Sequence, residues 1–161
     1  MLGHDTYLEG RGRMLGRLAG RWTVADGAGP EMDVSELSTW LNDALLLAPS
    51  MLLRTGATWR ALGTDRFEVT VIDSGHTVRA EVTIDRYGAP VDVATTDRWA
   101  DLPGGMVQAR WHTPVQWWID VDGRPFPGPG PAIWDLATGP LTYVDGRFVP
   151  GSLVVNIPPP T

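Results

Sequence analysis

Between residues 33 and 49 the apolar positions recur at the spacing of an α-helix. Residues three or four positions apart form one helix face, and this stretch supplies such a series: Val34, Leu37, Leu41, Ala44, Leu45 and Ala48. Asp33 is placed to cap the helix, and Glu36 follows three residues later, as in a capping box. Pro49 cannot continue a helix, so the pattern predicts one principal helix over residues 33–48.

Beyond residue 56 apolar and polar positions alternate, which is typical of β-strands with one buried face. The strands predicted in this way cover residues 58–62, 67–71, 78–84, 91–96, 106–112, 115–121, 132–136, 141–144 and 148–149. The joins carry Gly or Asp, as hairpin loops do, and residues 121–124 and 144–147 share the turn sequence Val-Asp-Gly-Arg. Before the helix, residues 6–18 and 21–24 are predicted to form another hairpin.

These elements predict a mainly β (α+β) fold. We expect a curved antiparallel sheet, which forms a half-barrel or a barrel meander, with one principal helix packed across it. Glycine and proline are spread between short apolar segments and are not massed in one linker, so we expect a single domain over residues 1–161. The helix and the apolar face of the sheet would enclose either a packed core or a ligand cavity.

Composition excludes several classes of function. The net charge of −6 opposes binding to the phosphates of nucleic acids. Cysteine and lysine are absent, which excludes thiolate nucleophiles, zinc–thiolate sites and lysine Schiff bases. The longest apolar run, residues 44–49, is far shorter than the roughly 20 residues of a membrane span. Residues 1–10 lack the apolar run of a signal peptide, so we expect a cytoplasmic protein.

Eight tryptophans are a high count for 161 residues, and three of them lie in residues 110–118. Tryptophan favours places that are partly apolar and partly polar. Trp117 and Trp118 are adjacent, so a regular strand would point them to opposite faces, and a covered second face could be a dimer interface. We expect aromatic residues to line a ligand cavity, and the candidates are Trp40, Trp59, Trp99, Trp111, Trp117, Trp118 and Tyr143.

Four stretches resemble a bacterial family known only as a domain of unknown function. They are residues 7–18, 29–53 and 95–105, and the trailing pair 121–127 and 139–150. The resemblance covers nearly the whole chain. It implies an architecture like the half-barrels that carry lipoproteins or lipids, in which a helix plugs the open side. It also implies that this chain lacks a portion before Tyr7, which a partner or a second copy would replace. No activity or catalytic residue is implied.

Candidate catalytic residues are few. Arg98 lies between Asp97 and Asp101 in sequence, and an arginine can hold one carboxylate ionised while another orients a water. The alternative is that Arg98 pairs with an acid at the surface. His112 is either a general base near neutral pH or a half-buried histidine at a strand end with one hydrogen bond. GxSxG, HExxH and GxGxxG are absent, so we expect neither a metal nor a cofactor.

Three hypotheses remain, and the first is preferred. It is the binding of an apolar small molecule or acyl chain in a tryptophan-lined cavity, with residues 33–53 as a lid. The second is a cofactor-independent hydrolase or isomerase, acting on an ester, lactone or epoxide through Asp97, Asp101 or His112. The third is an oligomerising structural module, in which exposed tryptophans form a homodimer interface.

Overall fold

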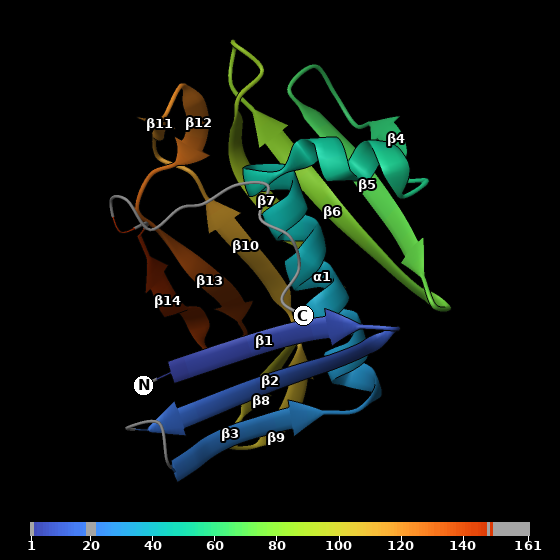
Figure 1. Cartoon of the computed structure of the whole chain (residues 1–161), viewed down its shortest axis with the longest axis vertical. Helices are drawn as coiled ribbons and strands as arrows, with labels where there is room; N and C mark the ends of the chain where they lie inside the picture. Colours follow the sequence, from blue (N-terminus) through green and yellow to red (C-terminus); the bar gives the residue numbers. More distant parts are fainter. Residues whose placement is uncertain (1, 19–21, 148, 150–161) are drawn as a thin grey trace.

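The computed structural model describes residues 2–18, 22–147 and 149, and most of them are in β-strands. The first three strands form an antiparallel sheet in the order β1–β2–β3, shown in blue in Figure 1: β1 (Leu2–Leu8), β2 (Arg11–Leu18) and β3 (Trp22–Ala28). The sequence predicted a hairpin here, and the structure corrects this to three strands. Gly3, Gly12 and Gly16 interrupt the apolar alternation, which hid the full length of the strands.

The main sheet is an antiparallel meander of seven strands in the order β14–β13–β10–β7–β6–β5–β4. Its strands are β4 (Thr58–Ala61), β5 (Arg66–Asp73), β6 (His76–Ile84), β7 (Pro90–Thr95), β10 (Arg110–Pro114), β13 (Gly130–Leu136) and β14 (Gly139–Gly146). Two hairpins leave this meander: β8 (Trp99–Leu102) with β9 (Gly105–Gln108), and β11 (Trp118–Val121) with β12 (Arg124–Pro127). The mainly β, antiparallel prediction is confirmed, and the sheets do not close into a barrel.

Helix α1 (Pro30–Leu47) crosses the main sheet and is followed by the 3₁₀-helix η1 (Pro49–Arg54). In Figure 1 α1 runs from the three-stranded sheet at the bottom of the view to η1 at the top. It packs against β1 and β2 on one side and against β6 and β7 on the other. The predicted principal helix and its end before Pro49 are confirmed. Within the described ranges, no helix is long and apolar enough to cross a bilayer.

The predicted start of the helix is wrong by one turn. Pro30 occupies the first position, where its fixed φ suits the helix and its missing N–H costs nothing. Asp33 therefore lies inside the first turn and is not a cap. Its carboxylate instead accepts a hydrogen bond from the amide of Gly12, at 2.8 Å. Glu36 is also not part of a capping box, because the helix already begins at Pro30 and Asp33 is not its cap.

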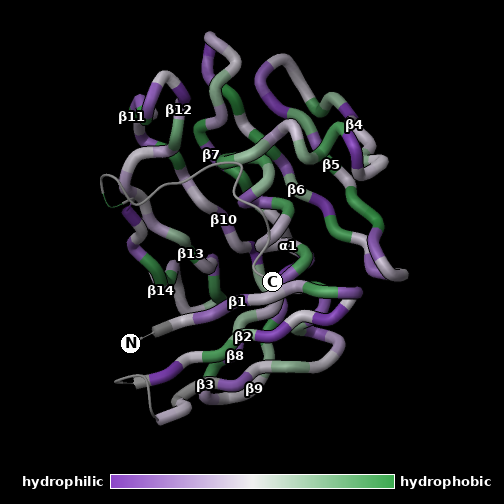
Figure 2. Tube along the Cα trace, viewed as in Figure 1, coloured by the Kyte–Doolittle hydropathy of each residue, from purple (hydrophilic) through white to green (hydrophobic). Residues whose placement is uncertain are grey.

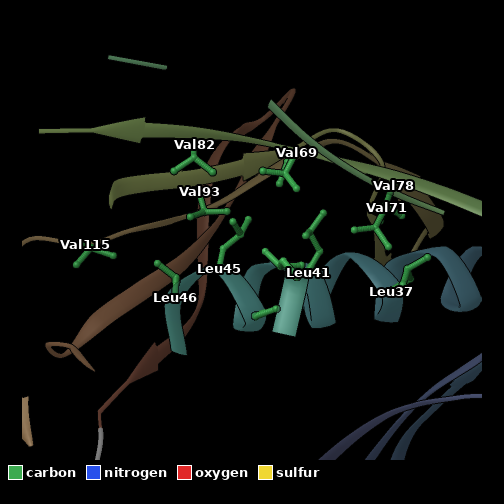
Figure 3. Packing of buried hydrophobic residues seen from close by; sticks show 13 residues of the cluster. Leu37, Leu41, Leu45, Leu46, Val69, Val71, Val78, Val82, Val93 and Val115 are labelled. Carbon is green, nitrogen blue, oxygen red and sulfur yellow. The ribbon is translucent and has the colours of Figure 1, made fainter. Parts of the chain in front are cut away.

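The main core lies between α1 and the facing strands of the seven-stranded sheet. Figure 3 shows leucines of the helix pointing at valines of the sheet: Leu37, Leu41, Leu45 and Leu46 face Val69, Val71, Val78, Val82 and Val93. Along β5 and β6 the buried positions alternate with exposed ones, which Figure 2 shows as alternating hydrophobic and hydrophilic positions. Burying a leucine or valine side chain contributes about 1.5–3 kcal/mol, so this face fixes α1 on the sheet.

Three strand boundaries differ from the sequence prediction. Residues 106–112 are not one strand: the chain breaks at Ala109, and β9 pairs with β8 while β10 joins the main sheet. Residues 115–117 are outside any strand, because the chain leaves the sheet after Pro114. Residues 144–146 end β14 and do not form a turn. The turn at Asp122 and Gly123 is confirmed, with φ of 53° and 77°. Phe148 lies outside the described residues.

Candidate functional site

Arg98 lies between β7 and β8, and only 4% of it is exposed. Its Nη1 donates a hydrogen bond to the Tyr143 hydroxyl at 2.7 Å. Its Cζ lies 4.3 Å from the ring centroid of Trp111, 5.3 Å from that of Trp134 and 5.7 Å from that of Tyr143. The guanidinium makes no ion pair with any carboxylate in the described part of the chain. The groups in direct contact with this buried cation are therefore aromatic rings and a hydroxyl, while the carboxylates of Glu36 and Asp43 act on its charge from a greater distance.

A cavity of about 190 Å³ lies against the guanidinium, and we call it the Arg98 cavity. Its wall comes from β2, the start of α1, the strand β8 and the pair β13–β14. The side chains that shape it are mostly apolar or aromatic: Met14, Met32, Trp99, Trp134, Leu141 and Tyr143. Methionine adapts to irregular shapes and aromatic rings offer large flat contacts, so this wall suits an apolar ligand.

Ser35 on α1 holds β8 in place beside the cavity. The Ser35 hydroxyl accepts a hydrogen bond from the amide of Trp99 at 2.9 Å and donates one to the carbonyl of Glu31 at 2.7 Å. The side chain of Ser35 is fully buried. The hairpin β8–β9 is thus tied to the first turns of α1, which positions Trp99 and Arg98 relative to the helix.

Three buried polar atoms in this region have no hydrogen-bond partner among the described residues: Arg98 Nε, Trp111 Nε1 and Glu36 Oε1. Arg98 and Trp111 are in direct contact, and Glu36 is close enough to Arg98 for the two charges to interact. Buried polar atoms without partners are rare in folded proteins. Two unpaired donors and one unpaired acceptor therefore mark this part of the core as unusual.

Glu36 is the titrating group of this region. Burial raises the pKa of its carboxyl to about 7, and the negative charge of Asp5 also raises it. The guanidinium of Arg98 acts in the opposite direction and lowers the pKa. The charge of Glu36 therefore changes near neutral pH, within reach of the charge on Arg98.

One family model matches residues 1–146, and its description is "Family of unknown function (DUF6544)". The chain belongs to the DUF6544 family. This confirms the resemblance to a family of unknown function. No curated protein and no solved structure matches the chain. All residues around the Arg98 cavity lie within the matched range, so the cavity belongs to the part of the chain that the DUF6544 model describes.

The acidic neighbours of Arg98 in this DUF6544 chain do not pair with it. The carboxylate of Asp97 accepts a hydrogen bond from the amide of Arg79 at 2.8 Å and lies 3.8 Å from the Arg79 guanidinium. Asp101 is exposed on β8, at the edge of the Arg98 cavity. The arrangement considered from the sequence, in which Arg98 holds one of these two carboxylates, is not formed, because the arginine side chain points into the aromatic cluster.

His112 lies on the face of the main sheet that points away from α1. Its Nδ1 is 3.1 Å from Oδ1 of Asp92, and its Nε2 is 3.8 Å from Oδ1 of Asp135. Arg110 binds the same two carboxylates, at 3.1 and 2.7 Å. The neighbouring Thr113 points to the other face, where its hydroxyl bonds the Asn42 side chain on α1. His112 therefore lies beside the ion pairs of Arg110 with Asp92 and Asp135, outside the Arg98 cavity. Among the described residues, no group of three or more His, Cys, Asp and Glu side chains could hold a metal ion.

The tryptophans that the sequence proposed as cavity residues are divided among several places in the DUF6544 fold. Trp99 and Tyr143 line the Arg98 cavity, and Trp111 packs on the arginine. Trp40 lines a second cavity, of about 300 Å³, with Tyr7 and Leu37.

The remaining three tryptophans are away from the Arg98 cavity. Trp59 is 49% exposed and contacts Phe67, with the ring centroids 5.6 Å apart. Trp117 is also 49% exposed. Trp118 packs on the main core and donates a hydrogen bond to the carbonyl of Pro90 at 3.1 Å.

Sequence reasoning missed Trp134 and Glu36. Trp134 is directly opposite Trp111 in the register of β13 and β10, and their ring centroids are 6.4 Å apart. Its alternation with Ile133 and Asp135 was a signal that it shares a face with Ala132. Glu36 was assigned to a helix cap, and its position among the apolar residues of α1 was the signal that its carboxyl is buried.

A third cavity, an apolar groove of about 340 Å³, lies at the carboxyl end of α1. Leu46 and Leu47 of the helix, Val115 and Val144 form part of its wall. Tryptophan is not among its lining residues in the described part of the chain. Among the described residues that line this groove and the Trp40 cavity, none is a buried charge without a partner, which distinguishes both from the Arg98 cavity.

Proposed function

We propose that this protein binds a small apolar molecule, or the end of an acyl chain, in the Arg98 cavity. The observation that carries the proposal is a buried arginine enclosed by aromatic rings, next to a cavity and without a carboxylate partner. Ligand sites combine a mostly apolar wall with a few directed polar groups, and this site has both. The cavity is smaller than the roughly 300–1,000 Å³ of sites for drug-sized ligands, which favours a small ligand.

The acid–base enzyme hypothesis has weaker support. Asp97, Asp101 and His112 lie in three different surroundings, and only Asp101 reaches the cavity wall. A general acid or base must lie within hydrogen-bond reach of the reacting atom, so one cavity does not serve all three. The oligomer hypothesis also has weaker support. Trp59 lies on β4 and Trp117 directly before β11, and these two strands lie at opposite sides of Figure 1.

A cavity-filling substitution tests the proposal. Ala100 is 3% exposed and lines the Arg98 cavity, so Ala100→Leu adds side-chain volume there. Ala137 is exposed in the turn between β13 and β14, and Ala137→Leu is the matched control. Isothermal titration calorimetry would measure the binding of two neutral probes, benzyl alcohol and 1-hexanol, to the wild type and to both variants.

We expect at least one probe to bind the wild type and the Ala137→Leu variant equally well. We expect its affinity for the Ala100→Leu variant to fall about tenfold or more, a loss of about 1.4 kcal/mol. If neither probe binds the folded wild type, or if Ala100→Leu leaves the affinity unchanged, the proposal is wrong. Native mass spectrometry of the purified protein adds a second measurement, because a retained ligand appears as an extra mass that denaturation removes.

A further inference from the structure

Arg98 has unused hydrogen-bonding capacity at the wall of the cavity. A guanidinium carries five N–H donors, and one of those in Arg98 binds the Tyr143 hydroxyl. Its Nε has no acceptor in the described part of the chain, although 96% of the residue's surface is covered. Isolated cations are costly to bury, and they are normally paired with an anion. The aromatic rings compensate part of this cost, but they accept no strong hydrogen bond.

A second donor without an acceptor lies next to this guanidinium. Trp111 is 3% exposed, and the ring that carries its unpaired Nε1 lies 4.3 Å from Cζ of Arg98. An indole N–H only donates hydrogen bonds, as does a guanidinium. Trp111 is not among the residues that line the Arg98 cavity, so of these two donors the guanidinium is the one placed to meet a ligand there. A guanidinium matches a group that only accepts hydrogen bonds, and an ionised carboxylate is such a group.

We propose that the ligand of the Arg98 cavity is an apolar monocarboxylate, whose carboxylate binds the guanidinium of Arg98 while its hydrocarbon part contacts the methionines and aromatic rings of the wall. This inference rests on the proposed function and narrows it to one class of ligand. Glu36 and Asp43 act on the charge of Arg98 from a distance, but no described carboxylate forms a direct ion pair with it, and the carboxylate of the ligand would form that pair. Charge-assisted hydrogen bonds are about twice as strong as neutral ones, so the acid group would provide specificity as well as affinity.

The size of the cavity limits the hydrocarbon part. At about 190 Å³ the cavity lies below the roughly 300–1,000 Å³ of sites for drug-sized ligands. A single aromatic ring or a short chain fits this volume better than a long acyl chain. Benzoate is therefore a suitable probe, and benzamide is its neutral counterpart with nearly the same shape.

The experiment compares benzoate with benzamide by isothermal titration calorimetry on the full chain at pH 6. Three proteins are measured: the wild type, Arg98→Met and Arg86→Met. Arg86 is exposed in the turn between β6 and β7, so its variant removes one positive charge far from the buried site and serves as the matched control. Circular dichroism and thermal unfolding report whether each variant is folded.

We expect benzoate to bind the wild type and Arg86→Met at least about tenfold more tightly than benzamide does. In Arg98→Met we expect this preference to disappear, with benzoate as weak as benzamide. Equal binding of the two probes to the wild type would contradict the carboxylate inference and leave the apolar-ligand proposal standing. If neither of the two neutral probes above binds the folded wild type, the proposed function itself is wrong.

The comparison of the two probes on the wild type does not depend on a variant that folds. If Arg98→Met is unfolded, Arg98→Lys keeps the charge and removes the planar fork of donors. We then expect a smaller preference for benzoate than in the wild type. The opposite result is that Arg98→Lys leaves the preference for benzoate unchanged and Arg86→Met removes it. The carboxylate would then bind elsewhere, and its assignment to Arg98 would be overturned.

Discussion

The amide of Gly12 donates a hydrogen bond to Oδ1 of Asp33, at 2.8 Å, and this bond joins β2 to the first turn of α1. Oδ2 of the same carboxylate accepts a hydrogen bond from Nη1 of Arg11 at 3.2 Å. Asp33 is 2% exposed, whereas 83% of the Arg11 side chain is exposed, so the bond from the backbone amide is the better protected of the two. The contact fixes the three-stranded sheet on the helix, next to the Arg98 cavity.

Replacing Asp33 tests this junction. Asp33→Ala leaves the buried Gly12 amide without an acceptor, and such a loss costs about 1–3 kcal/mol. Asp33→Asn keeps a carbonyl oxygen of the same reach, so we expect a smaller loss. Urea unfolding monitored by circular dichroism measures both values. Equal stability of the two variants would show that the acceptor oxygen does not determine the stability of the junction.

Gly12 is also limited by space. A Cβ at this position would lie 2.2 Å from the carbonyl oxygen of Met32, which is backbone and cannot move without shifting the helix. We expect Gly12→Ala to lower the free energy of unfolding by about 2 kcal/mol or more. Gly104→Ala is the matched control, because nothing lies within 4 Å of its Cβ. Thermal unfolding measures the stability of the two variants. A Gly12→Ala protein as stable as the control would contradict the close approach of Gly12 to the backbone of Met32.

Glu36 makes stability depend on pH. Its carboxyl has a pKa of about 7 in the folded protein against 4.5 in the reference state, so the folded state holds the proton more tightly. The resulting stabilisation is complete below pH 4.5 and is lost as the pH rises through about 7. The loss amounts to at most about 3.5 kcal/mol, at about 1.4 kcal/mol for each pKa unit.

Glu36→Gln removes this dependence. We expect the free energy of unfolding of the variant, relative to the wild type, to increase between pH 5 and pH 8. Glu31→Gln, at the partly exposed start of α1, controls for the loss of one carboxylate. Urea unfolding at both pH values measures the change. A constant difference between Glu36→Gln and the wild type would show that Glu36 does not titrate in this range.

The same group connects ligand affinity to pH, if the ligand is a carboxylate. Asp5 on β1, Asp43 on α1 and Arg98 are the charged groups that act on Glu36. Ionised Glu36 adds a negative charge near Arg98 and competes with the ligand. We expect the affinity of benzoate to fall between pH 6 and pH 8, by about fivefold for a repulsion of roughly 1 kcal/mol. Calorimetry on the Glu36→Gln variant provides the comparison, and its affinity should stay constant over this range.

Local signals in the sequence predicted part of the fold. The end of the helix at Pro49 and the strands between residues 58 and 96 follow from proline chemistry and from alternation over a few residues. The start of the helix depends on a different kind of contact. The carboxylate of Asp33 binds an amide 21 residues upstream, and this partner is invisible to a capping rule that considers only neighbours in the chain.

The candidate site also has a part that the sequence indicated and a part that depends on contacts between distant residues. Trp99, Trp111 and Arg98 could be selected from the sequence, because aromatic residues and an arginine cluster there. Their arrangement could not be predicted. The alternation of apolar and polar residues continues through Ala109, although the chain passes there from the hairpin β8–β9 to the main sheet. The pairing of Trp111 with Trp134 depends on the register between β10 and β13, which the hairpin β11–β12 separates in sequence. Sequence neighbours therefore suggested Asp97 or Asp101 as the partner of Arg98, and the fold supplies Tyr143 instead.

The position of α1 between two sheets has a consequence for synthesis on the ribosome. When a nascent chain has emerged as far as Arg54, it contains β1, β2 and α1 but no strand of the main sheet. The leucine face of the helix, which Figure 3 shows against the valines, then has no partner. It is covered only after β6 and β7 have emerged, at Thr95. During this interval the leucine face is exposed, and exposed apolar surface of this kind makes a nascent chain prone to aggregation.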